Sequence, residues 1–174
     1  MGKLYDVVVT WLHEGDWEFV ENQRDNGDHW TRSRYKADNA TFDLVLETSE
    51  AQEEFFVYVY WPTRVPPDRC GAVAELMARI NYGMRLGNFE LDMRDGEIRY
   101  KVSVDVEGAQ LVPQMIENMV RAALSTADRY APAIMSCSYG DKNALDALRV
   151  VREEATDEVV ASDTVEAGQS NILQ

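Results

Sequence analysis

The stretch "RINYGMRLGNFELDMRDGEIRYKVSVDV" (79–106) contains the pattern that decides the fold. Two runs of alternating apolar and charged residues flank the dipeptide Asp95-Gly96, which strongly signals a two-residue hairpin turn. With that turn, every facing pair joins apolar to apolar or acid to base: Met93–Ile98, Leu91–Tyr100, Phe89–Val102, Arg94–Glu97, Asp92–Arg99 and Glu90–Lys101. Matched pairs of this kind predict an antiparallel hairpin with one apolar face.

The glycines of this stretch do not predict a ligand loop. Gly83 and Gly87 lie at the C-terminal end of a helical apolar pattern over 68–86, and Gly87 stands where such a helix needs its C-terminal glycine. A phosphate loop would instead place glycines between a strand and a helix N-terminus. A calcium loop centred on Gly96 would put Leu91 and Met93 at ligand positions. We therefore predict no cofactor and no metal site.

The rest of the chain alternates between strand and helix patterns. Apolar spacing predicts a helix over 3–13, a long helix over 110–130 that Pro132 bends or breaks, a further turn or two up to Gly140, and a short helix over 143–155. Period-two alternation predicts strands at 30–36, 41–47 and 54–61. The sequence thus predicts an α+β fold in which an antiparallel sheet is packed with helices.

Charge divides the chain into two parts. The net charge is −14, and residues 153–174 hold six acids and no base. We therefore expect a single domain over 1–152 and an acidic disordered tail over 153–174. An acidic body repels phosphate backbones, which argues against nucleic acid and favours a soluble partner with a basic or apolar surface. No apolar run approaches the ~20 residues of a membrane span, and no signal peptide is evident. We expect a cytoplasmic protein with no membrane partner.

Few residues could carry catalysis. The only histidines are His13 and His29, and no serine or cysteine lies in a nucleophile motif. Cys70 and Cys137 are isolated and are expected to be buried, reduced thiols. The hairpin acids each face a base, which lowers their pKa and suits them poorly to general acid catalysis. We predict no catalytic residue and a protein that is not an enzyme.

The strand at 54–61 is apolar on both faces. Phe55, Val57, Val59 and Trp61 share one face, and Phe56, Tyr58 and Tyr60 share the other. Either the first helix or the C-terminal segment covers the second face, or that face meets another molecule. Aromatic sheet faces also occur in RNA-recognition folds, but the acidic turn "SEAQEE" (49–54) stands where basic residues would be needed. Phe56, Tyr58 and Tyr60 are therefore the candidate partner-binding residues.

The same stretch resembles the YbjN family of small bacterial proteins. The first matching features are an Asn in the second helix, Asn81, and a Gly-x-Phe that enters a strand, Gly87 and Phe89. An acidic-Gly turn, Asp95 and Gly96, is followed by Arg99 and Tyr100, and the closing segment is "DRYAPAIMSCSYG" (128–140). The likeness covers roughly 1–140, although the long strand at 30–36 exceeds the minimal family pattern. The resemblance implies a fold similar to that of type III secretion chaperones, which are α+β, usually homodimeric and acidic, and hold extended segments of client proteins. Family members are often labelled regulators of sensory transduction, and no catalytic residues are implied.

These observations favour a non-enzymatic, homodimeric binding protein of chaperone-like or regulatory type that acts on an unidentified protein partner. It would use apolar and sheet-edge surface. The alternative is a small-molecule-binding or enzymatic α+β domain, in which Tyr58, Tyr60 and either Arg34 or Arg64 line a pocket between sheet and helix.

Overall fold

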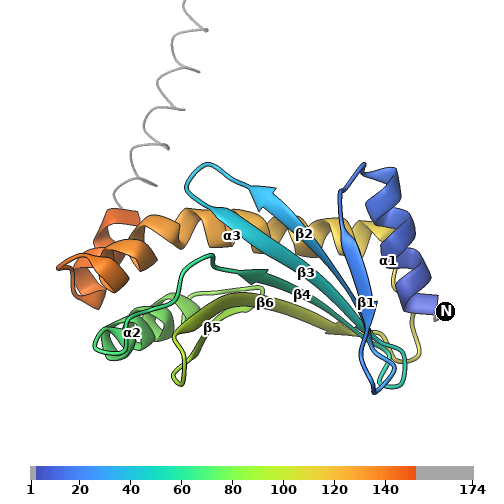
Figure 1. Cartoon of the computed structure of the whole chain (residues 1–174), viewed down its shortest axis with the longest axis horizontal. Helices are drawn as coiled ribbons and strands as arrows, with labels where there is room; N and C mark the ends of the chain where they lie inside the picture. The colour runs from blue at the N-terminus through green and yellow to red at the C-terminus, as the bar shows by residue number, and fades with distance from the viewer. Residues whose placement is uncertain (1–2, 152–174) are drawn as a thin grey trace, which may run out of the picture.

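The six strands form one antiparallel sheet in the computed structural model, which describes residues 3–151 (Figure 1). The elements in chain order are α1 (Lys3–Glu14), β1 (Val20–Gln23), β2 (His29–Lys36), β3 (Thr41–Ser49), β4 (Glu54–Tyr60), α2 (Cys70–Asn81), β5 (Asn88–Asp92), β6 (Glu97–Asp105) and α3 (Pro113–Tyr139). The strands lie in the order β1-β2-β3-β4-β6-β5. Residues 144–151 are also helical, whereas the predicted tail 153–174 lies outside the described residues. The α+β fold is confirmed.

The helices gather on one face of the sheet (Figure 1). The strand residues on that face are buried together with the apolar sides of α1, α2 and α3; in β4 they are Phe55, Val57 and Val59, all with no exposed surface. Since α1 packs on this face, it does not cover Phe56, Tyr58 and Tyr60, which lie on the other. Within residues 3–151 no helix covers this other face, called the open face below, and residues 152–174 of the C-terminal segment lie outside the described residues.

Small residues let α3 lie close to the sheet. Ala123, Ala127 and Ala131 are buried at successive turns of the helix and contribute to the core. Pro113 begins the helix, where its missing N–H costs nothing. The helix then runs without a break through Pro132 to Tyr139, so the turns predicted between 132 and 140 belong to one continuous helix.

A side chain from the β2–β3 turn compensates for Pro132. Proline has no N–H to donate to the carbonyl of Asp128, four residues earlier. The side-chain amide of Asn39 donates to that carbonyl at 3.3 Å, and the backbone N–H of Asn39 donates to the Asp128 carboxylate at 2.8 Å. These bonds attach the β2–β3 turn to α3 at the point where the helix lacks its own bond.

The predicted hairpin is present, but its register was wrong. Phe89 pairs with Tyr100 and Leu91 with Ile98, so each residue faces a partner two positions from the predicted one. The turn is a four-residue loop over 93–96, because Asp92 accepts from the backbone N–H groups of both Gly96, at 2.8 Å, and Arg94, at 2.9 Å. A shift of two preserves which side chains share a face, so Phe89, Ile98 and Tyr100 remain buried, whereas Met93 lies in the loop and is 59% exposed.

The second helix is shorter than predicted, and Gly87 does not cap it. α2 ends at Asn81, whose side-chain amide both donates to and accepts from the backbone of Phe89, at 3.0 and 2.8 Å. Gly87 precedes β5 with φ +72°, and a Cβ there would approach the carbonyl oxygen of Lys101 and the ring of Tyr100 within 2.8 Å. The glycine therefore permits close backbone contact between β5 and β6.

Candidate functional site

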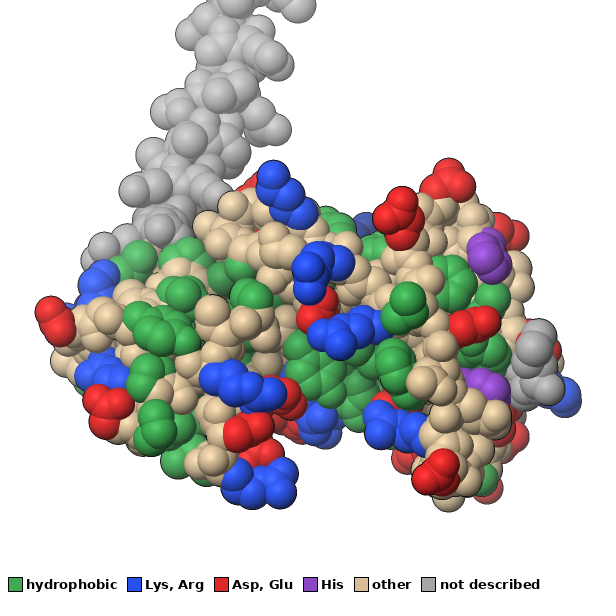
Figure 2. All heavy atoms as spheres, in the orientation of Figure 1, with side chains coloured by type: hydrophobic (Ala, Val, Ile, Leu, Met, Phe, Trp, Pro, Cys, Tyr) green, Lys and Arg blue, Asp and Glu red, His purple; other side chains and the backbone are tan. Residues whose placement is uncertain are grey.

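Three aromatic side chains run along the centre of the open face of the sheet. Phe56, Tyr58 and Tyr60 point away from the helices, with ring centroids 5.9 and 6.0 Å apart along the strand. Their cross-strand neighbours are Asp43, Val45 and Glu47 in β3 and Arg99, Lys101 and Ser103 in β6. In the space-filling view, hydrophobic side chains fill a hollow near the middle of this face, with lysine and arginine side chains around it (Figure 2).

Arg99 joins the aromatic row to the edge of the sheet. Its guanidinium carbon lies 4.7 Å from the ring centroid of Tyr58, and its N–H groups donate to the hydroxyl of Tyr60 at 3.3 Å and to Glu90 at 2.6 Å. Burial alone would raise the pKa of Glu90, but hydrogen bonds from Lys101 and Arg99 hold it below its usual value. Glu90 therefore stays ionised and keeps Arg99 over the tyrosine rings.

The hydroxyl of Tyr58 stays protonated at physiological pH. Burial, followed by the negative charge of Glu47, raises the pKa of Tyr58 to about 12. A neutral tyrosine provides a large apolar ring together with a hydroxyl that both donates and accepts. Tyr58 is therefore suited to binding another protein surface rather than to proton transfer.

Arginine side chains border one side of this face. Arg24 pairs with Glu47 at 2.6 Å. Arg32 and Arg34 both pair with Asp43, and the Arg34–Asp43 distance is 3.4 Å. Arg64, from the loop after β4, pairs with Asp95 at 2.5 Å and with Glu97 at 2.9 Å. We call the space between them the arginine cleft; it has a volume of about 600 Å³ and is lined by Arg24, Trp30, Arg32, Arg34, Thr41, Asp43, Val45, Tyr60, Trp61, Pro62, Arg64 and Glu97.

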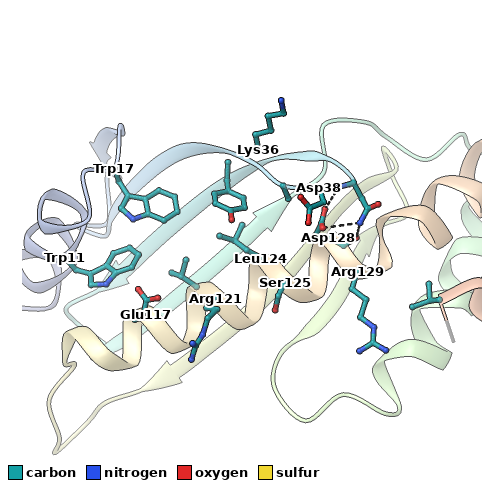
Figure 3. Close-up of a pocket in the computed structure, with 15 residues that line it drawn as sticks. Trp11, Trp17, Lys36, Asp38, Glu117, Arg121, Leu124, Ser125, Asp128 and Arg129 are labelled. Carbon is teal, nitrogen blue, oxygen red and sulfur yellow. Dashed lines mark hydrogen bonds between the residues drawn. The ribbon is translucent and has the colours of Figure 1, made fainter. Parts of the chain in front are cut away.

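A second cleft, of about 800 Å³, lies on the helical side between α1, the β2–β3 turn and α3. Figure 3 shows Trp11 and Trp17 near its α1 end and the hydrogen-bonded carboxylate of Asp128 towards its other end. That carboxylate already accepts two bonds from Asn39. The polar groups at that end of the cleft therefore serve to attach the β2–β3 turn to the helix.

The described residues show no arrangement typical of catalysis. Within residues 3–151, no group of three or more His, Cys, Asp or Glu could hold a metal ion. Cys70 and Cys137 are free and buried, as predicted, and burial raises the pKa of the Cys137 thiol. Glu90 faces Arg99 across the hairpin and has a lowered pKa, as predicted. Asp92 faces Glu97 and not a base, so that part of the prediction was wrong; hydrogen bonds from Arg94 in the loop lower its pKa to about 2.

The structure places the predicted site residues together but not between sheet and helix. Tyr60, Arg34 and Arg64 line the arginine cleft on the open face, so the location assumed by the small-molecule alternative was wrong. Sequence reasoning missed Arg24 and Arg32 as parts of this surface. A signal for Arg32 was available, because Arg32, Arg34 and Lys36 alternate along β2 and must share one face.

No helix within residues 3–151 has the length and hydrophobicity needed to cross a bilayer. No curated protein matches the sequence at a significant level.

Comparison with solved structures supports the fold. The crystal structure of YbjN from E. coli superposes with a TM-score of 0.53 at 15% identity, covering 71% of this chain and 85% of that one. The ExsC–ExsE complex gives a TM-score of 0.53 at 13% identity, and the match covers 75% of this chain and 95% of that one. The HopA1–SchA chaperone–effector complex has a lower TM-score, 0.41 at 16% identity, and the match covers 72% of this chain and 89% of that one. The expected similarity to type III secretion chaperones, which include ExsC, is thus confirmed at the level of fold.

The family profile of YbjN, described as "Putative bacterial sensory transduction regulator", matches residues 4–135. This range spans most of the chain and contains Asn81, Gly87 and the hairpin. It also contains the Asn39–Asp128 attachment of the β2–β3 turn to α3. The chain belongs to the YbjN family.

Proposed function

We propose that this protein is a non-enzymatic regulator or chaperone-like protein that binds a partner protein through the open face of its sheet. One observation carries the proposal: Phe56, Tyr58 and Tyr60 form an aromatic row along a face that none of the described helices covers. The family description as a sensory transduction regulator and the occurrence of ExsC in a complex with ExsE support a protein partner.

The aromatic row has the properties of a binding hot spot. Tyrosine buries a large area at low cost in side-chain entropy, and interface energy concentrates in such residues. The edge strand β1, separated from β4 by β2 and β3, is exposed along its whole length from Val20 to Gln23, so an extended segment could also pair with its backbone. The row and the edge would therefore contact different parts of the partner.

The test is photo-crosslinking in cells. A photoreactive phenylalanine analogue at Tyr58 is expected to capture a defined protein, and the same analogue at Tyr82, which is 97% exposed at the end of α2, serves as the matched control. In the captured complex, Tyr58→Ala is expected to weaken binding by about tenfold or more, and Tyr82→Ala to leave it unchanged. Capture at Tyr82 alone, or at neither position, would contradict the proposal.

We further propose that the protein is a cytoplasmic homodimer. The chaperone-like resemblance supports a dimer. Sedimentation velocity at tens of micromolar measures the assembly directly. A monomer at that concentration would exclude the dimer without affecting the proposal for the open face.

A further inference from the structure

We propose that the arginine cleft recognises the carboxylates of an acidic segment of the partner protein, one that also carries apolar side chains. This inference rests on the proposed function and specifies the chemistry of its partner. It also reverses the expectation from net charge, since the chain carries −14 overall and was expected to favour a basic or apolar partner. Local charge at the cleft, not total charge, decides which side chains the cleft accepts.

Arginine is the commonest charged residue in the lining of the cleft, where Arg24, Arg32, Arg34 and Arg64 stand against Asp43 and Glu97. Arg24 and Arg64 also pair with Glu47 and Asp95 outside the lining, so the charge that the cleft presents depends on how deep the paired groups lie. The paired groups also differ in depth. The side chain of Arg34 is 77% exposed and that of its partner Asp43 only 18%. Arg24 and Arg32 are likewise more exposed than their partners, whereas Arg64 and Asp95 are equally exposed. An approaching segment meets positive charge first.

The arginines keep hydrogen-bonding capacity for a ligand. Arg32 and Arg34 share the single carboxylate of Asp43, and the contact of Arg34 is long, at 3.4 Å. A guanidinium has five N–H donors, so each of these side chains has donors left over. Those donors match the geometry of a carboxylate, which arginine binds through two parallel bonds.

The floor of the cleft is apolar. Trp30, Val45, Tyr60 and Pro62 line it between the arginines. In an extended segment, carboxylates bound by the arginines would therefore alternate with apolar side chains that contact these apolar residues. The rest of the acidic surface repels a long phosphate backbone, which favours an acidic peptide segment over nucleic acid.

The test measures the charge preference of the full-length chain by fluorescence anisotropy. The probe is a short labelled peptide that alternates glutamate with leucine, and the comparison peptides replace each glutamate with glutamine or with lysine. The glutamate peptide is expected to bind at least about tenfold more tightly than either, with an affinity that falls as salt rises.

Two matched variants locate the binding. Arg34→Gln removes the exposed charge with least disturbance to Asp43 and is expected to weaken the glutamate peptide by about tenfold. Arg121→Gln, an exposed arginine of α3 beside the other cleft, is expected to have no effect. Circular dichroism confirms that both variants fold. Equal binding of the lysine peptide, no binding of any peptide, or no loss in Arg34→Gln would overturn the inference.

The outcomes also separate this inference from the proposed function. If the lysine peptide binds and Tyr58→Ala abolishes its binding, the open face still binds proteins and only the charge assignment fails. If crosslinking at Tyr58 captures nothing, the proposed function fails as well. Replacing all six acids of 153–174 by their amides tests the chain's own segment as the occupant: glutamate-peptide binding that becomes several-fold tighter would overturn the assignment to a partner.

Discussion

The two faces of the sheet use neighbouring residues of the same strands for different purposes. Phe55 and Phe56 are adjacent in β4, yet Phe55 is completely buried under the helices and Phe56 lies partly exposed on the open face. Burial explains every large apolar residue on the helical face. It does not explain an aromatic row on the open face, where the fold would accept polar residues. The contrast supports the proposal that one face determines stability and the other binds a partner.

The largest expected effect comes from removing the buried member of that pair. Phe55→Ala is expected to lower the free energy of unfolding by about 3–5 kcal/mol, because it leaves a cavity in the core. Phe56→Ala is expected to cost less than about 1 kcal/mol, since it removes only cross-strand contacts. Urea unfolding measures both. Equal losses would show that something covers the open face in the free protein.

A matched pair of glycines tests the packing of β5 on β6. Gly87 and Gly108 both have positive φ, at +72° and +70°, but only at Gly87 would a Cβ meet other atoms. Gly108→Ala is expected to cost about 1–2 kcal/mol from backbone strain, and Gly87→Ala a further ~1–3 kcal/mol from the clash. Thermal unfolding of the two variants should separate them. If they are equally stable, Gly87 does not mark a close contact between these strands.

The attachment of the β2–β3 turn to α3 predicts a smaller effect. Asn39→Ala removes the side-chain donor that replaces the missing N–H of Pro132, and it is expected to cost about 1–2 kcal/mol. Asn118→Ala, which removes only exposed side-chain bonds from Gln114 and Arg121 within α3, is the control and should cost less. Hydrogen exchange adds a local readout, with faster exchange expected around Asp128 only in Asn39→Ala. Unchanged exchange there would contradict the role given to Asn39.

The smallest predicted effect is a pH dependence on the open face. The pKa of Glu90 is lower in the folded than in the unfolded state, so its contribution is present at neutral pH and is lost as pH falls below about 4. Glu90→Gln should therefore flatten the acid limb of the stability curve, by less than about 1 kcal/mol because solvent screens the pair. Guanidinium unfolding at stepwise lower pH measures this. A steeper acid limb in Glu90→Gln would contradict the assigned sign.

Local patterns predicted the elements well, for identifiable reasons. The alternation in 54–61 and the apolar spacing of 3–13 reflect burial of one side, which periodicity records directly. The hairpin register was not predictable in the same way, because a shift of two residues keeps Phe89 and Leu91 on the buried face. The loop was decided instead by hydrogen bonds to Asp92, which pairing rules do not describe.

The candidate site was predicted only in part. Phe56, Tyr58 and Tyr60 share one strand, so alternation was enough to group them. Arg24 and Arg64 lie forty residues apart in two loops and meet only because β1, β2, β3 and β4 are neighbours in the sheet. Net charge favoured a basic or apolar partner, whereas the arginine cleft supports the acidic segment that we propose, because net charge averages over surfaces that the fold separates.

If the open face binds the partner, Tyr58 and Tyr60 are accessible in the free protein and covered in the complex. Hydroxyl-radical footprinting with mass spectrometry measures this directly on the full-length chain, alone and with the partner captured by crosslinking. Both tyrosines are expected to be oxidised in the free protein and protected in the complex, while Tyr82 reacts equally in both states. Protection of Tyr58 and Tyr60 already in the free protein, or no change on binding, would contradict binding through the open face.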